Sequence, residues 1–446
     1  MLTPAETIVA LATPPGTGGV GVVRMSGGQV ERIARAMLGS LPEPRVATYA
    51  TFRDARGEPV DTGLALYFPG PASFTGESVV ELQGHGGPLV LSILVEAAVE
   101  LGARRAEPGE FTKRAFLNDK IDLAQAEAIA DLIESGTAQA ARAALRSLSG
   151  AFSDAVNSLV DQLTGIRMYV EAAIDFPEEE IDFLGDEELG ERLSSCSAAF
   201  ESLLSQAAVG RVMRDGYQVV IVGKPNAGKS SLMNRLSGEE TAIVTELAGT
   251  TRDVLRERIN IDGLAVELVD TAGLRDNPDR IEEEGIRRAR KAMAEADAVL
   301  WIQDATEAVP EQIEEPVPDG IPVTIVRNKI DLSGERAGTV DGKRPVVLLS
   351  ARTGEGLDAL RERIRELAGF RDLGEGAFTA RRRHVEALRD AHRHFQAGRA
   401  ALRDAHAGEL LAEELRLSQQ ALGTITGEFT ADDLLGRIFS EFCIGK

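Results

Sequence analysis

The feature that most constrains the fold is a phosphate-binding loop in the middle of the chain. Residues 223–230 read GKPNAGKS, follow the apolar run QVVIV at 218–222 and precede the helix-compatible run SLMNRL at 231–236. In a strand, glycine-rich loop and helix start, backbone N–H groups converge on phosphate oxygens at a helix N-terminus that favours negative charge. Lys229 would reach the outer phosphates, and the Ser230 hydroxyl would ligate Mg²⁺. The loop predicts an α/β nucleotide-binding domain, although a single match could also be a chance glycine turn.

Four further motifs follow in the order that a nucleotide site of this type requires. Thr250 and Thr251 offer a second hydroxyl for Mg²⁺, and DTAG at 270–273 ends an apolar run, where Asp270 can hold Mg²⁺ through water. NKID at 328–331 and SAR at 350–352 also follow apolar runs. Asp331 can accept hydrogen bonds from guanine N1–H and from the exocyclic amine, so this loop selects guanine over adenine. Five motifs at the carboxyl ends of predicted strands indicate a GTPase domain rather than chance turns.

Composition limits the compartment and the partners. Lys and Arg number 49 against 71 Asp and Glu, and the resulting net charge of −22 argues against indiscriminate binding to nucleic acids or membrane surfaces. Any nucleic-acid contact is then expected to be local or shared with a partner. Cys196 and Cys443 lie far apart and form no metal-ligand or disulfide pattern. No cationic leader with an apolar core precedes Thr3, and no apolar run is long enough to span a bilayer, so a soluble, cytoplasmic protein is expected.

The chain of 446 residues has room for two to four domains. Residues 1–118 mix short strands with one helix at 88–101, and 119–211 change to Ala- and Leu-rich helical periodicity. The GTPase motifs occupy 212–371, and helical periodicity returns over 372–446. Helical sequence on both sides suggests that a Ras-like α/β GTPase domain is inserted into one all-helical domain, behind an N-terminal α+β domain. A linear string of four separate domains is the alternative.

Three smaller features have simple structural interpretations. The glycines at 16–19 are interpreted as turn glycines rather than a dinucleotide fingerprint, because the segment after them resembles a strand. His85 is expected to be structural, and Cys196, which matches no motif, is expected to pack in a helix. The basic run RRRH at 381–384 opens a helix and is either a tRNA-facing patch or a solvated helix end.

Several stretches outside the GTPase motifs resemble one family over essentially the whole chain. They are TGE at 75–77, ELQGHGG at 81–87, PGEF at 108–111, NDK at 118–120 and FCIGK at 442–446. The sequence resembles the bacterial tRNA uridine-modification GTPases, called MnmE or TrmE. The resemblance implies a homodimer formed through the N-terminal domain, and a heterotetramer with an FAD-dependent partner like MnmG (GidA). It also implies addition of a carboxymethylaminomethyl or aminomethyl group to C5 of the wobble uridine of certain tRNAs, with 5-formyl- or methylene-tetrahydrofolate as one-carbon donor.

The hydrolysis machinery is expected to differ from that of many small GTPases. They place Gln directly after the DxxG motif to orient water, but this chain has Leu274, which cannot form that hydrogen bond. The Asn226 side-chain carbonyl can ligate a monovalent cation or can simply brace its loop. The resemblance implies K⁺, with Thr245, Leu247 and Thr250 as further ligands. It also makes Glu282 the catalytic carboxylate, although a solvated helix start in an acidic run is the competing interpretation.

Motifs and resemblance together predict the sites. The predicted Mg²⁺ ligands are Ser230 and Thr251. The predicted GTP contacts are Asn226, Ala227, Gly228, Lys229, Ser230, Ser231, Thr245, Glu246, Leu247, Ala248, Gly249, Thr250, Thr251, Asp270, Thr271, Ala272, Gly273, Asn328, Lys329, Asp331, Ser350, Ala351 and Arg352.

A folate pocket is the last prediction from the resemblance. Arg24, Glu81, Lys120 and Lys446 match family positions that contact the folate; ordinary surface ion pairs are the alternative. Arg and Lys can pair with the carboxylates of the folate tail, and Glu81 can accept from the pterin. Cys443 is then a nucleophile or proton donor near the one-carbon unit, or else a partly buried thiol at a helix end.

A protein of a different functional class shares part of this pattern. Ribosome-assembly or regulatory switch GTPases also carry an Asn in the phosphate loop, but they usually add an RNA-binding module with a basic face. This chain instead has the GHGG segment, an acidic balance and the terminal Cys443. The sequence therefore favours the tRNA-modification interpretation over the switch.

Overall fold

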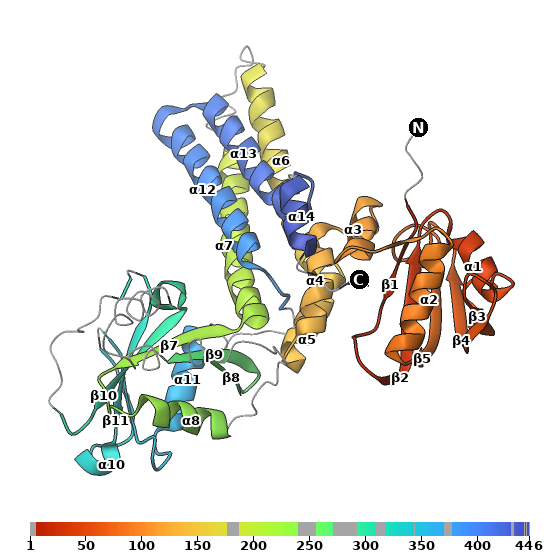
Figure 1. Ribbon diagram of the computed structural model, residues 1–446. Coiled ribbons are helices and arrows are strands. Elements are labelled where there is room, and N and C mark those ends of the chain that lie inside the picture. Colours follow the sequence, from red (N-terminus) through yellow and green to blue (C-terminus); the bar gives the residue numbers. More distant parts are fainter. Residues whose placement is uncertain are drawn as a thin grey trace, which may run out of the picture. The chain divides into compact units, whose positions relative to one another are not determined.

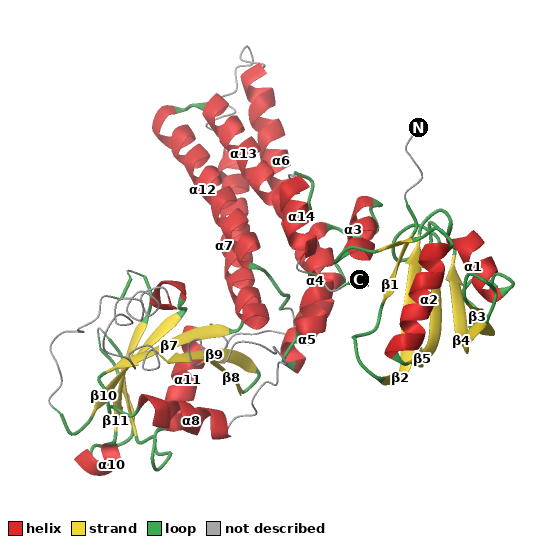
Figure 2. Cartoon of the chain, in the orientation of Figure 1, coloured by secondary structure: helices red, strands yellow, loops and turns green. Residues whose placement is uncertain are grey.

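The computed structural model describes residues 6–175, 187–239, 256–270, 292–307, 317–318, 320–342, 344–369, 377–429, 432–440, 442 and 444–445. Its contacts divide the chain into two compact units, residues 1–130 with 420–446 and residues 131–419. Figure 1 labels the elements, and Figure 2 distinguishes helices from strands. The limits predicted from sequence at residues 118, 211 and 371 stay predictions.

The first unit contains a six-stranded sheet in the order β3-β4-β5-β2-β1-β6. Its strands are β1 (Ile8–Leu11), β2 (Gly18–Ser26), β3 (Thr48–Arg53), β4 (Pro59–Phe68), β5 (Val79–Gly86) and β6 (Arg104–Arg105). Side chains alternate between the two faces: Val23 and Met25 are fully buried, whereas Arg24 between them points to the other face. β2 and β5 pair so that Arg24 lies directly opposite Glu81.

Helices α1 (Val30–Leu38) and α2 (Pro88–Glu100) share one apolar core with this sheet, and α3 (Glu110–Leu117) follows β6. The expectation of a single helix in this segment was wrong. The first missed helix, α1, buries Val30, Ile33, Ala34 and Met37, a spacing that lines up one helical face. It was missed because it is short and begins without a side-chain cap, after two glycines.

Glycines at the sheet ends also differ from expectation. β2 already begins at Gly18, and β5 continues to Gly86, where the sequence suggested turns. A Cβ added to Gly86 would lie 2.6 Å from the Gly18 carbonyl oxygen. These glycines therefore allow close approach of two strands rather than a change of chain direction.

The C-terminal end of the chain belongs to the first unit. Helix α14 (Asp432–Ser440) packs with Phe442 against α4 (Leu123–Glu134) in one apolar cluster, and Ile444 forms an isolated bridge with Pro108. Gly445 has a φ of 96°, and a Cβ there would lie 1.8 Å from the Leu11 carbonyl oxygen. Only glycine fits that position. The terminal segment, predicted as part of the helical domain, thus reaches the N-terminal sheet.

The second unit contains a seven-stranded sheet in the order β12-β13-β11-β10-β7-β9-β8. The five strands from β13 to β9 are parallel, and β8 and β12 are antiparallel edges. The strands are β7 (Tyr217–Gly223), β8 (Arg256–Ile261), β9 (Leu264–Asp270), β10 (Ala298–Asp304), β11 (Val323–Asn328), β12 (Gly338–Val340) and β13 (Val346–Leu349). The order reverses between β7 and β10, and α/β sheets bind ligands at such a switch point.

Apolar residues cover both faces of this sheet. Leu232 and Leu236 of α8 (Lys229–Glu239) and Leu360 of α11 (Leu357–Leu367) pack on one face, and Met293 packs on the other. A short helix, α10 (Ile330–Ser333), follows β11. The predicted α/β nucleotide-binding fold is confirmed.

Helices precede and follow this sheet and pack with one another. They are α5 (Ala138–Leu148), α6 (Ala151–Asp175), α7 (Glu187–Asp215), α12 (Arg382–Ala405) and α13 (Gly408–Thr426). The Phe200 ring of α7 lies 5.2 Å from the Phe395 ring of α12, measured between centroids. The α/β domain is therefore inserted into a helical bundle, as predicted. No helix within the described ranges is both long and apolar enough to cross a membrane.

Cys196 lies inside this bundle. It is fully buried on α7, and burial raises the pKa of its thiol to about 12. A thiol with so high a pKa is unreactive at neutral pH. The prediction of a packing role is confirmed.

Candidate nucleotide-binding site

The phosphate loop connects β7 to α8 at the switch point of the sheet. Gly223 has a φ of 149°, and a Cβ there would lie 2.3 Å from the Ile302 carbonyl oxygen of β10. Lys229 is buried, and its Nζ donates to the carbonyls of Gly223 and Lys224 at 2.8 and 2.9 Å. The loop is thus wrapped around its own lysine, with Ser230 and Ser231 exposed at the helix start. This arrangement suits a polyphosphate bound at the mouth of the loop.

Asn328, the first residue of the NKID motif, braces the phosphate loop. Its Nδ2 donates to the Ala227 carbonyl at 2.9 Å, and its Oδ1 accepts from the backbone N–H of Ala351 at 2.9 Å. A Cβ on Gly228 would lie 2.2 Å from that Nδ2. One buried amide therefore joins three of the predicted motifs. The sequence placed Asn328 in the site but did not reveal this role.

Asp331 and Ser350 form the base-recognition end of the site. The Ser350 hydroxyl is fully buried and lies 2.7 Å from Asp331 Oδ1, while Asp331 itself is exposed. Ser350 Oγ also accepts from the Thr353 N–H at 3.2 Å. The hydroxyl holds the carboxylate in place, leaving its second oxygen available to a ligand. This geometry suits a carboxylate that accepts from a guanine edge.

Lys329 pairs with an acidic residue that the motifs did not predict. Its backbone is left-handed, with φ of 72°, and its Nζ lies 2.6 Å from Asp304 Oδ2 at the end of β10. The hydrogen bond from Lys329 lowers the pKa of Asp304 to about 2. Asp304 is therefore ionised at neutral pH and orients the lysine.

Asn226 is exposed and has a left-handed backbone with φ of 64°. Asn tolerates this conformation better than most residues do. The backbone of Asp270 lies opposite Ile221 of β7, so β9 ends beside the phosphate loop. Arg352 is exposed beside Ala351, after β13. The remaining predicted positions lie outside the described residues: Thr245, Glu246, Leu247, Ala248, Gly249, Thr250, Thr251, Thr271, Ala272, Gly273, Leu274, Glu282, Cys443 and Lys446.

A second group of predicted residues meets on the N-terminal sheet. Arg24 Nε lies 2.8 Å from Glu81 Oε1, and Arg24 Nη1 lies 3.4 Å from the Gly445 carbonyl oxygen. The Arg24 guanidinium also lies over the Phe111 ring, 5.8 Å from its centroid. Lys120 makes a different contact, because its Nζ donates to the Pro71 carbonyl at 3.1 Å. The structure thus brings Arg24, Glu81 and the backbone of Gly445 together.

The TGE and PGEF segments form one polar network that sequence reasoning missed. The Ser26 hydroxyl donates to Glu77, and Glu77 pairs with Arg114 at 2.9 Å. Arg114 also bonds Glu110, which receives two further hydrogen bonds from Arg104. Burial alone would raise the pKa of Glu110, but these hydrogen bonds and one from the Glu107 N–H lower it to about 2. The residues that the resemblance singled out are therefore partly structural.

His85 is held by Asp61. One Asp61 oxygen accepts from the His85 N–H at 2.8 Å, and the other lies 2.7 Å from the ring Nδ1. This contact is consistent with the structural role expected for His85.

The basic run at 381–384 is not a surface patch as a whole. Arg381 is buried and pairs with Asp131 at 2.7 Å, and His384 is buried with its Nδ1 accepting from the Arg381 N–H. Arg382, which is 75% exposed, fits either sequence interpretation, and Arg383 is half-buried. The partner Asp131 lies 250 residues away in the chain, so the sequence offered no local signal for the burial.

Comparisons with known proteins identify the family of this chain. A family model described as the MnmE helical domain matches residues 123–443, and one described as the GTP-binding protein TrmE N-terminus matches residues 7–120. The chain belongs to the MnmE (TrmE) family. The family assignment predicted from the short motifs is confirmed.

Two relatives match the chain over its full length. Both are called tRNA modification GTPase MnmE. The protein of Pectobacterium carotovorum subsp. carotovorum (strain PC1) is 56% identical over 450 residues, 99% of each chain. That of Pseudomonas syringae pv. tomato (strain ATCC BAA-871 / DC3000) is 56% identical over 457 residues, the whole of both chains. Among solved structures, the G domain of the T. maritima FeoB iron transporter is 28% identical, with a TM-score of 0.26, over 34% of this chain and 98% of that chain.

Proposed function

We propose that this protein is a GTP hydrolase that acts in tRNA modification. The observation that carries the first half is the Ser350–Asp331 pair, joined through Asn328 to the phosphate loop. The second half is supported by the family membership and by relatives that carry this activity in their names over their full length. We propose the cytoplasm as its compartment.

We propose a distinct role for each of the described residues in the nucleotide site. The carboxylate of Asp331 accepts from the guanine edge, and the loop around Lys229 receives the phosphates. The exposed Ser230 hydroxyl, at the start of α8, would hold Mg²⁺ together with Thr251, and the ion would neutralise charge on the outer phosphates. A serine hydroxyl is an oxygen donor of the kind that Mg²⁺ prefers, so the residue present fits this ion.

K⁺ activation is the finer proposal for hydrolysis. Asn226 is exposed in a left-handed turn of the phosphate loop, so its side-chain oxygen is available as a ligand for a monovalent cation. Thr245, Leu247 and Thr250 would complete the ligand set. The ion would supply the positive charge that an arginine finger supplies elsewhere. Glu282 is proposed to orient the attacking water, since Leu274 cannot.

The modification itself is proposed to use the Arg24 and Glu81 cluster. Their 2.8 Å pair lies beside the backbone of Gly445, and Lys446 follows Gly445 in the sequence. We propose that this cluster, with Lys120, binds a tetrahydrofolate one-carbon donor in a homodimer. An FAD-dependent partner like MnmG would complete the enzyme that modifies C5 of the wobble uridine.

Changing the base-recognition carboxylate tests the nucleotide half of the proposal. Xanthine has a carbonyl where guanine has its exocyclic amine, so Asp331→Asn should weaken GTP binding and favour XTP. The measurement is the kcat/KM for GTP, XTP and ATP in the wild type, in Asp331→Asn and in Asp358→Asn as an exposed control. Retained GTP preference in Asp331→Asn would contradict the assignment.

A further inference from the structure

Two segments of chain connect the inserted α/β domain to the helical bundle, and Asp131 of α4 holds both. The first runs from the end of α7 through Gly216 into β7, and the second returns through residues 377–381 into α12. Arg214 Nε on the first segment lies 2.9 Å from Asp131 Oδ1. Arg381 Nη2 on the second lies 2.7 Å from the same oxygen.

Because both arginines bond the same oxygen of Asp131, the geometry of this contact is restricted. Two hydrogen bonds to one atom fix the separation of the two arginines, and therefore of the two chain crossings. The Asp131 side chain is only 4% exposed, so water cannot easily replace either arginine. Removing the negative charge would take this carboxylate away from the buried Arg381 guanidinium, which is unfavourable.

Neighbouring contacts hold the same two segments more locally. On the returning segment, the Ser147 hydroxyl of α5 bonds the N–H and the carbonyl of Thr379 at 2.9 and 3.0 Å. On the first segment, Arg211 of α7 pairs with Asp297 at 2.6 Å, just before β10. Each of these contacts involves one crossing only. Asp131 joins the two crossings through one charged group, and α7 also approaches the returning segment at Gly210, where a Cβ would lie 2.5 Å from the Phe378 carbonyl oxygen.

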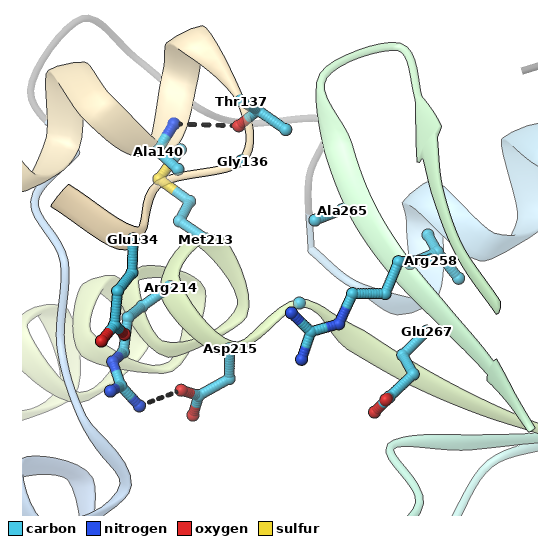
Figure 3. A pocket seen from close by; sticks show the side chains of 12 residues that line it. Glu134, Gly136, Thr137, Ala140, Met213, Arg214, Asp215, Arg258, Ala265 and Glu267 are labelled. Atoms are coloured by element: carbon cyan, nitrogen blue, oxygen red, sulfur yellow. Dashed lines mark hydrogen bonds and ion pairs between the residues drawn. The ribbon is translucent and has the colours of Figure 1, made fainter. Parts of the chain in front are cut away.

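The space beside Arg214 is not tightly filled. A cavity of about 50 Å³ lies between the end of α7, the α4–α5 connection and the β8–β9 hairpin. Figure 3 shows Arg214 and Asp215 on one side of it, Arg258 and Glu267 on the other, and Glu134 at its edge. That volume has room for ordered water but holds no side chain. Apolar packing also holds the hairpin that leads to Asp270, because Val212 and Met213 of α7 share one buried cluster with Ile259 and Val266.

From these contacts we propose that Asp131 is a positioning residue that fixes the orientation of the nucleotide-binding domain on the helical bundle. Movement of β7 on nucleotide exchange would reach the bundle through this carboxylate, because the crossing that leads into β7 is tied to it. The inference rests on the insertion of one domain into the other and does not depend on the substrate of modification.

A distance measurement in the full-length protein tests the proposal. Fluorophores are attached at Asn157→Cys on α6 and Asp358→Cys on α11, with Cys443→Ser, and the distance distribution is recorded by single-molecule energy transfer. Cys196 is fully buried and stays unlabelled. The intact protein should give one narrow distribution, and Asp131→Asn should widen it at least twofold, while GTP affinity stays within about twofold.

Matched variants separate this role from general destabilisation. Asp131→Glu keeps the charge and should keep the distribution narrow. Arg214 also pairs with Asp215, whose side chain is 29% exposed. Asp215→Asn removes that carboxylate and should also leave the distance distribution narrow. If too little Asp131→Asn folds, Arg381→Lys, which loses the second guanidinium, should widen the distribution instead. An unchanged distribution in Asp131→Asn, or equal widening in Asp215→Asn, would overturn the proposal.

Discussion

Ser350→Ala removes the hydroxyl that holds Asp331 but leaves every residue of the NKID motif in place. The lost hydrogen bond is 2.7 Å long and ends on a carboxylate, and bonds to charged groups contribute about 1.5–3 kcal/mol. Asp331 is exposed, so water replaces part of the bond, and the lower value applies. About 1.5 kcal/mol corresponds to roughly tenfold weaker GDP binding.

Stopped-flow release of fluorescent GDP measures this effect directly. Dissociation of GDP should be about tenfold faster. Association should be nearly unchanged, because the variant loses a hydrogen bond that holds Asp331 in place but keeps every charged group of the site. Inosine diphosphate lacks the exocyclic amine and should lose less affinity than GDP. Thr353→Ala is the matched control, since its hydroxyl contacts only the Glu355 N–H of the same loop among the described residues. Equal losses for both nucleotides, or no loss, would refute the assigned role of Ser350.

The remaining predictions concern the other proposed sites and Glu110. Replacing K⁺ by Na⁺ at equal ionic strength should slow GTP turnover at least about tenfold if Asn226 ligates K⁺; equal rates would reject that role. Glu282→Ala should slow hydrolysis about a hundredfold and spare GTP affinity, and unchanged turnover would count against it. Calorimetry should find that Glu81→Ala abolishes folate binding but not GTP binding. Cys443→Ser should still bind both ligands but should no longer modify tRNA. Full modification by Cys443→Ser would show that Cys443 is structural. The pKa of Glu110 is depressed from 4.5 to about 2, so its stabilisation is present above pH 4.5 and lost as the pH falls towards 2. Amide exchange in α3 should therefore rise over that range in the wild type and less in Glu110→Gln; equal rises would contradict this.

The sequence predicted the strands and loops of the nucleotide-binding domain well because its information is local. Each motif directly follows an apolar strand, and parallel strands bring their carboxyl ends to one edge of a sheet. β7, β11 and β13 therefore end where the apolar runs predicted. The same logic could not reveal that Asn328 spans 101 residues to brace Ala227.

Contacts between distant segments account for the errors. Arg381 and His384 look like a solvated basic run because their environment is supplied by other parts of the chain. The attachment of Gly445 to the N-terminal sheet was likewise hidden, since a terminal glycine has no preferred partner in sequence. Helix α1 was missed for a different reason: it is nine residues long and lacks a side-chain cap.

The central claim is that tRNA modification by this protein depends on guanine recognition. One measurement tests it directly. Nucleosides of bulk tRNA are quantified by mass spectrometry in cells lacking this protein and complemented with the wild type or with Asp331→Asn. The wild type should restore the modified wobble uridine, and Asp331→Asn, expressed at the same level, should not. Full restoration by Asp331→Asn, or normal uridines in cells lacking the protein, would contradict the account.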